Sequence, residues 1–186
     1  MTDRHTAGAM NYLFEIGLLK RAKRTGWWIA GVKDPETIAE HSFRAAIIGT
    51  MLAAMEGADP ARTALLCLLH DTQETRVGDI PHIGRRYLTA TDNEAVTADQ
   101  LAGSPPEVAS VIQEAVAEFE RGDTLEATVA QDADKLECLV QAIEYQAQGC
   151  GNVQSWIDSS RATLKTASAI RLAEAAVSTG TLDWLK

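Results

Sequence analysis

The sequence predicts an all-α protein built as a helical bundle, and three observations support this fold class. Alanine, leucine and glutamate are abundant, whereas aromatic residues make up 5% of the 186 residues, a balance that favours packed helices over pleated sheets. Apolar residues recur at helical spacing in several segments, and no segment shows sustained alternation with a period of two. Helix start signals and glycine stops separate these segments.

The first predicted helix covers residues 10–23, where apolar side chains recur with a roughly helical period. Residues 26–33 lie between glycines and are expected to form a loop or an extended segment. Asp34-Pro35-Glu36 predicts the next helix start, because it offers an N-cap carboxylate, a proline at the first helical position and a negative charge in the first turn. This helix should continue to about Glu56.

Asp59-Pro60 repeats the same start signal before residues 61–74, which are apolar almost all round and predict a buried central helix. A break at residues 78–81 precedes a shorter helical piece that should end before Thr91. Another helix is expected over residues 93–101.

The pattern Ser104-Pro105-Pro106-Glu107 predicts the start of a helix that ends near Gly122. Residues 124–148 predict a long helix, which a glycine-rich stop terminates. Residues 153–178 are expected to form one or two final helices.

The chain length suits one domain with a sizeable core. We expect a single domain over residues 1–186, with a core at about 10–150 and C-terminal helices at about 153–186. Apolar residues make up 46% and charged residues 23%, which is typical of compact globular proteins rather than disordered or fibrous ones.

The formal net charge of −9 argues against a protein that binds a nucleic-acid polymer, because such proteins need a basic footprint. A few converging arginines could still bind one small phosphate compound. The 3 cysteines show no paired spacing, which favours a reducing compartment. No signal-peptide pattern and no membrane-spanning apolar run is apparent, so we expect a cytoplasmic protein that does not bind a membrane.

His70-Asp71 closes the apolar central helix, where ionisable groups need a charge, a metal or hydrogen bonds to offset desolvation. Alone, the pair has a simpler explanation, a helix-terminal histidine beside a capping aspartate. His41 on the preceding helix and Asp132 or Asp134 on the long later helix favour a metal site, because facing helices of a bundle then supply the ligands together. Imidazole and carboxylate ligands suit Mn, Co, Fe, Ni or Zn, with Mg possible.

The order of these residues resembles the HD superfamily of metal-dependent phosphohydrolases, whose pattern is a histidine, a His-Asp pair and a distant aspartate. The matching positions are His41, His70, Asp71 and Asp134. Flanking segments extend the resemblance to the branch that contains 5′-deoxynucleotidases: Leu19-Lys20-Arg21, Arg24-Thr25-Gly26-Trp27, residues 35–42, residues 70–74, Gly78-Asp79-Ile80 and Asp134-Lys135-Leu136. The resemblance covers about residues 13–145 and implies an HD-domain helical bundle.

The resemblance favours Asp134 over Asp132 as the last ligand, because the family has an aspartate followed by a few residues of apolar helix. Residues two apart on a helix do not share a face, so the two carboxylates should not reach one metal. Members with two irons need two further histidines on another helix. His5 and His82 cannot supply that set, so we expect one divalent metal ion.

Glu74 and Asp79 are the candidate catalytic residues. Glu74 follows His70 by four residues, so a continuing helix would place its carboxylate on the same face. The resemblance implies catalytic or water-orienting roles for both, without deciding which is the acid. The alternatives are an exposed helix-end charge for Glu74 and a turn or N-cap role for Asp79.

Arg24, Trp27 and Arg44 are the candidate substrate-binding residues. Arg44 follows His41 by three residues and shares its helical face. Arg24 is the first candidate for the phosphate, although related bacterial enzymes have an arginine directly before the tryptophan, where this chain has Gly26. Trp27 resembles a tryptophan that crowds the 2′ position of the sugar. Its alternative is a core or interface aromatic, which is also the expectation for Trp28.

The resulting hypothesis is a hydrolase that cleaves (deoxy)nucleoside 5′-monophosphates to nucleoside and phosphate. The alternatives are an HD phosphohydrolase for another nucleotide, or a non-catalytic helical module that binds metal or nucleotide. The resemblance and the apolar helices after residue 153 also predict a homodimer, with Trp156 and Trp184 as candidate interface anchors.

Overall fold

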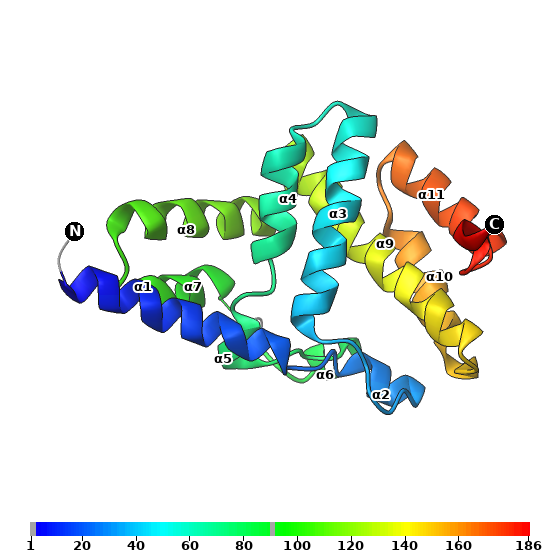
Figure 1. Cartoon of the computed structure of the whole chain (residues 1–186), viewed down its shortest axis with the longest axis horizontal. Coiled ribbons are helices and arrows are strands. Elements are labelled where there is room, and N and C mark those ends of the chain that lie inside the picture. The colour runs from blue at the N-terminus through cyan, green and yellow to red at the C-terminus, as the bar shows by residue number, and fades with distance from the viewer. Residues whose placement is uncertain (1–2, 90–91) are drawn as a thin grey trace.

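The computed structural model describes residues 3–89 and 92–186, and all regular elements in these ranges are helices (Figure 1). In chain order they are α1 (Asp3–Ile16), η1 (Gly17–Lys20), α2 (Gly26–Ala30), α3 (Ile38–Glu56), α4 (Pro60–Leu69), α5 (Glu74–Val77), α6 (His82–Arg85), α7 (Asn93–Leu101), α8 (Pro106–Arg121), α9 (Leu125–Ala147), η2 (Gly151–Val153), α10 (Gln154–Thr163), α11 (Ala167–Ser178) and η3 (Asp183–Leu185). Extended pairing within the described ranges is limited to one isolated bridge between Lys23 and Thr37. The predicted all-α class is confirmed.

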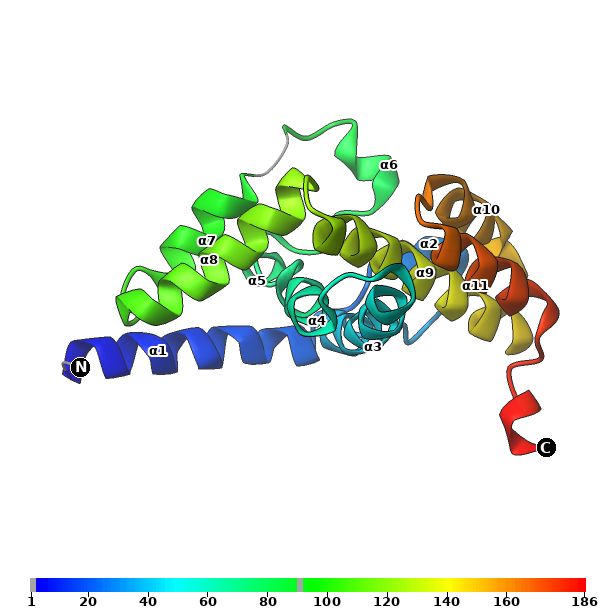
Figure 2. The same ribbon diagram turned by 90° about the horizontal axis from the view of Figure 1, so that it is seen from above.

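Helices α3, α4 and α9 pack on one another at the centre of the molecule, and they carry most of the chemistry described below (Figures 1 and 2). Helices α10 and α11 lie against α9, whereas α8 contacts α4 and pairs with α7. The contact between α3 and α4 is close at Gly49, where an added Cβ would lie 2.7 Å from Cys67 Sγ. Glycine at this position therefore sets the separation of the two helices that hold the site.

Helix α3 begins three residues later than Asp34-Pro35-Glu36 predicts, at Ile38 instead of Pro35. Its N-cap is Thr37, whose side chain accepts a hydrogen bond from the Glu40 amide, while the Glu40 carboxylate accepts one from the Thr37 amide. This capping box satisfies two amide groups that the first turn leaves without partners. The side chain of Asp34 instead pairs with Lys23 at 2.8 Å, so the earlier carboxylate belongs to the preceding loop.

The central helix also ends earlier than predicted, because α4 stops at Leu69 and His70 is its C-cap. It is not buried all round, since Leu68 is 47% exposed. The segment expected to be a loop contains α2, which ends at Gly31 with a φ of 94°. The short helical piece is α6, and its predicted limit at Thr91 lies outside the described residues.

The core consists mainly of small and aliphatic side chains from α3, α4, α8 and α9. Among the fully buried side chains are Leu52 of α3, Leu66 of α4 and Leu139 of α9. Small residues let these helices approach closely, so ligands on different helices can meet. None of the helices in the described ranges combines the length and apolar character needed to cross a bilayer.

Candidate metal centre

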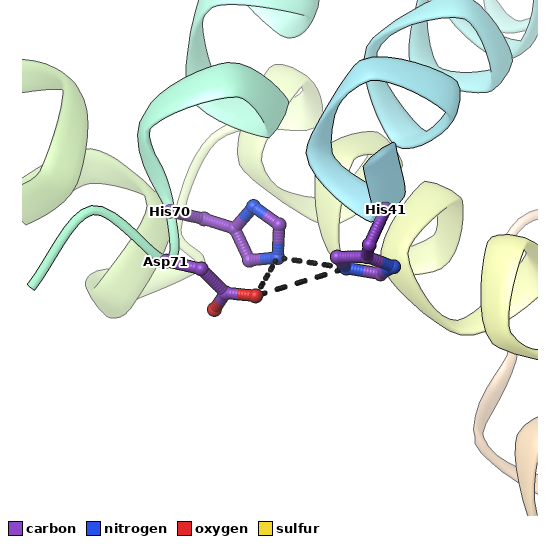
Figure 3. A group of neighbouring side chains, drawn as sticks. All are labelled: His41, His70 and Asp71. Atoms are coloured by element: carbon purple, nitrogen blue, oxygen red, sulfur yellow. Dashed lines mark hydrogen bonds and ion pairs between the residues drawn. The ribbon is translucent and has the colours of Figure 1, made fainter. Parts of the chain in front are cut away.

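Two histidines and an aspartate converge where the start of α3 faces the end of α4 (Figure 3). Nε2 of His41 lies 3.4 Å from Nε2 of His70. Oδ2 of Asp71 lies 3.2 Å from the His70 nitrogen and 3.7 Å from the His41 nitrogen. The three donor atoms therefore surround one point between the helices.

A fourth donor comes from α9. Oδ1 of Asp134 lies 3.2 Å from Nε2 of His41 and 3.8 Å from Nε2 of His70. Asp132 has a different position, because its carboxylate accepts hydrogen bonds from the amides of Lys165 and Thr166 and from the Thr166 hydroxyl. Asp134 on one face of α9 thus contributes to the cluster, while Asp132 on another face binds the start of α11.

Hydrogen bonds on the far side of each imidazole direct Nε2 toward the cluster. Nδ1 of His70 donates to the Cys67 carbonyl at 2.7 Å, and Nδ1 of His41 lies 2.5 Å from Oε2 of Glu137. A hydrogen on Nδ1 leaves the Nε2 lone pair free, which is how proteins orient metal-binding histidines.

The charges around the cluster favour binding of a cation. Burial lowers the pKa of His41 and the nearby Arg24 lowers it further, but the carboxylates of Asp134 and Glu137 outweigh both and raise it to about 9. Burial raises the pKa of Asp71, yet His70, Arg24 and His41 hold it below its ordinary value. Burial likewise raises the pKa of Asp134, but His41, His70 and Lys135 hold it well below its ordinary value. The carboxylates of Asp71 and Asp134 therefore stay ionised inside the protein and favour a cation between them.

The donor set fits a divalent metal ion. Metal to ligand distances of about 2.0–2.2 Å separate neighbouring ligands by roughly 3.0–3.6 Å. The distances of 3.4 Å, 3.2 Å and 3.2 Å between donors lie in this range, and those of 3.7 Å and 3.8 Å lie just above it. Two neutral imidazoles and two carboxylates would neutralise the ion and satisfy its preference for mixed nitrogen and oxygen ligands. His41, His70, Asp71 and Asp134 would therefore hold it.

Glu74 lies beside the cluster, although α4 does not continue to it as the helical-face argument assumed. It begins the separate short helix α5 after a turn. Burial, together with the charges of Asp71 and Asp79, raises the pKa of Glu74 to about 8, and its buried Oε2 atom has no hydrogen-bond partner. Glu74 is thus not the exposed helix-end charge of the alternative interpretation.

Asp79 and Arg24 are both tied to this region by contacts distant in sequence. Oδ2 of Asp79 accepts hydrogen bonds from the amide and the hydroxyl of Thr25. Nη1 of Arg24 donates to Oδ2 of Asp71 at 3.2 Å. Two consecutive residues before α2 therefore bind the two candidate-site carboxylates, Arg24 binding Asp71 of the cluster and Thr25 binding Asp79.

The cluster opens into a cavity of about 550 Å³. Its polar wall includes His70, Asp71, Glu74, Asp134 and Lys135. The apolar part of its wall comes from α5, α8 and the segments around α6, namely Val77, Ile80, Leu88 and Phe119. The ring of Phe119 also lies 4.9 Å from the ring of His70.

The structure does not bring Arg44 and Trp27 into this cavity. The Arg44 guanidinium binds Glu137 and Glu144, on the opposite side of His41. Trp27 is 2% exposed, and its indole N–H donates to Glu36. Both residues have their polar groups occupied within the protein, so their predicted substrate contacts remain untested predictions.

The other tryptophans differ from one another in exposure. Trp28 is 52% exposed and so is not a core residue. Trp156 stacks on Trp27 with ring centroids 5.7 Å apart, so it packs within the chain, and its predicted interface role stays a prediction. Trp184 is exposed.

Sequence reasoning missed Glu137 and Lys135 as members of the site. Glu137 is fully buried and holds His41, and its position three residues after Asp134 on α9 could have identified it as sharing that face. Lys135 binds Asp134 and lines the cavity. A lysine on a helix is most often solvated, so the only sequence signal for it was its place in the segment Asp134-Lys135-Leu136 that carries the family resemblance.

Comparison with known proteins places this architecture in a family. The HD domain model matches residues 16–174. The chain is 34% identical over 171 residues to 5′-deoxynucleotidase HDDC2 of Dictyostelium discoideum, covering 81% of this chain and 88% of that protein. It is also 34% identical to 5′-deoxynucleotidase hdd1 of Schizosaccharomyces pombe, covering 70% and 69% of the two chains.

Among solved structures, a conserved hypothetical protein from Pyrococcus furiosus superimposes with a TM-score of 0.74 at 28% identity, covering 91% of this chain and 99% of that one. This likeness extends over nearly the whole chain. The chain belongs to the HD domain family and, among its members, is similar to the 5′-deoxynucleotidases.

Proposed function

We propose that this protein hydrolyses nucleoside 5′-monophosphates, preferably those of deoxyribose, to nucleoside and phosphate. The observation that carries the proposal is the convergence of His41, His70, Asp71 and Asp134 on the wall of a cavity that also contains Glu74. The similarity to 5′-deoxynucleotidases supports the same substrate class. When bound, a divalent ion supplies a Lewis acid for a phosphoryl oxygen and a water nucleophile at neutral pH.

The side chains around the cluster have complementary roles in this proposal. The carboxyl group of Glu74, whose pKa is raised to about 8 in the metal-free protein by burial and by the charges of Asp71 and Asp79, can give a proton to the departing 5′-oxygen. Asp79, held by Thr25, accepts a hydrogen bond from the attacking water. Arg24, bound to Asp71, offsets the negative charge that develops on the phosphoryl group. As the water oxygen bonds to phosphorus, the bond from phosphorus to the 5′-oxygen breaks.

The cavity has a suitable size and chemistry for a nucleotide. Its volume of about 550 Å³ is within the range of small-molecule sites, which usually combine apolar walls with a few polar groups. In the proposed orientation the phosphate lies at Asp71 and Asp134, and the nucleoside lies against the apolar side chains of Ile80, Leu88 and Phe119. A mononucleotide therefore suits this site better than a polymer.

The proposal extends to assembly and location. A stripe of apolar side chains on α3, formed by Phe43, Ile47, Met51 and Met55, is about half exposed or more and suits packing against a second copy of the chain. We therefore place the predicted homodimer interface on α3. The cytoplasm remains the proposed location, because the three cysteines are free thiols.

A phosphate-release screen tests the function. Metal-stripped protein is resupplied with one divalent ion at a time and offered deoxy- and ribonucleoside monophosphates, triphosphates and cyclic nucleotides. We expect release from 5′-monophosphates and none with the Asp134→Ala variant. Selective release from another nucleotide class would change the substrate assignment, and binding without release under every metal would support a non-catalytic module instead.

A further inference from the structure

Lys135 is a cation at the edge of the cluster that the proposed reaction does not use. It follows Asp134 on α9, and its ammonium nitrogen lies 2.7 Å from Oδ2 of Asp134. The other carboxylate oxygen of Asp134, Oδ1, lies 3.2 Å from Nε2 of His41. The carboxylate thus joins the ammonium group of Lys135 to the cluster, and the lysine side chain lines the cavity.

The other cations that line this cavity in the described part of the chain are held differently. Nζ of Lys165 donates to Oε1 of Gln131 at 3.0 Å, and Nε of Arg85 donates to the Ile80 carbonyl at 3.3 Å. Neither contact is to a member of the cluster. Arg24 does contact Asp71 but is not part of the cavity wall. Lys135 therefore combines both properties, contact with a cluster carboxylate and access to the cavity.

The charges of the substrate and of the site indicate why a cation is useful at position 135. A phosphate monoester carries nearly two negative charges at neutral pH. The carboxylates of Asp71 and Asp134 would balance one divalent ion, which leaves the charge of the phosphate group uncompensated. Arg24 supplies one positive charge next to Asp71, and Lys135 supplies the second one next to Asp134.

We propose that Lys135 binds the phosphate group of the substrate and holds it at the metal centre. A lysine ammonium group has three hydrogens, and its bond to Asp134 uses one of them. The remaining two can bind phosphoryl oxygens in the cavity, where an ammonium group acts as a point charge. The inference rests on the proposed function, because it assumes that the phosphate group is the part of the substrate nearest to the cluster.

Inorganic phosphate serves as the probe, and its affinity for the metal-loaded protein is measured calorimetrically for wild type, Lys135→Met, Lys135→Arg and Lys165→Met. Loss of a charged hydrogen bond should weaken phosphate binding roughly 10- to 100-fold in Lys135→Met. Lys135→Arg should retain part of the affinity, and Lys165→Met should lie within about threefold of wild type. The affinity for the divalent ion, measured by competition with a chelator, should stay within about threefold in all variants.

Three results would overturn the proposal. These are unchanged phosphate affinity in Lys135→Met, an equal loss in Lys165→Met, or a loss of metal affinity that accounts for the whole effect and makes Lys135 a positioning residue for Asp134. Phosphate release from nucleotides by the wild-type protein tests the proposed function separately. If it binds phosphate through Lys135 but releases none from nucleotides, the reaction is wrong while the phosphate site stands.

Discussion

Oε2 of Glu137 lies 2.5 Å from Nδ1 of His41, and both side chains are completely inaccessible to solvent. This contact fixes the tautomer and the orientation of the imidazole. Glu137→Gln keeps the shape of the side chain but removes the charge that the imidazole faces, so we expect metal affinity to fall roughly 10- to 100-fold. Metal titration of the stripped protein measures the change.

Glu144 offers a matched control for this variant. It binds the same arginine as Glu137, with Arg44 Nη1 2.8 Å from Oε2 of Glu144, but it has no contact with His41. Glu144→Gln should therefore change metal affinity by less than about threefold. Equal losses in the two variants would mean that the effect comes from releasing Arg44 and not from the histidine.

Substituting Asp134 should affect metal binding, whereas substituting Asp132 should affect stability. Asp134→Ala deletes a donor and should abolish tight metal binding and turnover. Asp132→Ala removes a carboxylate that accepts the amide hydrogens of Lys165 and Thr166 at the start of α11. It should lower the free energy of unfolding by about 1–3 kcal/mol and leave metal affinity intact. Metal content and chemical denaturation of both variants test this, and a loss of metal in Asp132→Ala would reverse the assignment.

The pH dependence of stability should report on Glu74 in the metal-free protein. Its pKa is raised from 4.5 to about 8, so the folded state keeps a proton that the unfolded chain releases at lower pH. The resulting stability is complete below about pH 4.5 and is lost as the pH rises through about pH 8. Glu74→Gln, which cannot ionise, should flatten the decline between about pH 5 and about pH 8. Urea denaturation across this range measures it, and parallel curves would show that Glu74 is ionised in the folded protein.

Trp27 and Trp28 are adjacent in the sequence, but Trp27 is buried and Trp28 is exposed, so truncating each should affect stability differently. Trp27→Ala removes a core ring and should cost about 3–5 kcal/mol of stability, whereas Trp28→Ala should change it by less than about 0.5 kcal/mol.

The predicted sugar role of Trp27 is tested with Trp27→Phe, which preserves a ring against Trp156. If the indole excludes a 2′-hydroxyl, the ratio of kcat/KM for deoxy- and ribonucleotide should fall roughly tenfold. An unchanged ratio would restrict Trp27 to packing.

The exposed stripe on α3 predicts where the homodimer can be broken. Met51 lies in the middle of that stripe, so a charge there would have to be desolvated in the interface. Met51→Glu should shift the particle mass toward the 20.1 kDa chain, while Trp184→Glu at the C-terminus should not. Light scattering at micromolar concentration checks both. A wild-type protein that is already monomeric, or dissociation by the Trp184 change instead, would contradict the proposed surface.

Much of the fold could be predicted because its signals are local. Asp59 caps α4 as expected, and the bounds of α7 match the prediction at both ends. The start of α3 was misplaced because two cap signals compete within four residues. Asp34-Pro35 has the better composition for a helix start, but Thr37 and Glu40 satisfy each other's amides. Deciding between them needs the position of Lys23, which binds Asp34 from another part of the chain.

The same distinction between local signals and contacts distant in sequence applies to the site. The cluster of His41, His70, Asp71 and Asp134 could be proposed from sequence, because the residues occur in a recognisable order. Glu74, Asp79 and Arg24 could also be named, but their contacts could not, since the hydrogen bond of Thr25 with Asp79 joins residues 54 positions apart in the chain. The side chain of Arg44 turns away toward Glu144, although it shares a helical face with His41, because three acceptors on α9 outcompete the cavity for its guanidinium group.

The two walls of the cavity differ in how they are built. Its donors come from α3, from the residues that directly follow α4 and from α9, and these helices contribute many core side chains, whereas Val77, Ile80 and Leu88 come from short helices and connecting segments. Changes in such connecting segments are tolerated far better than changes in a packed core. In the proposed orientation the nucleoside lies against this wall, so we expect substitutions there to change the preferred base and to leave the reaction chemistry unchanged. This bundle is therefore a suitable starting point for laboratory evolution of nucleotide selectivity.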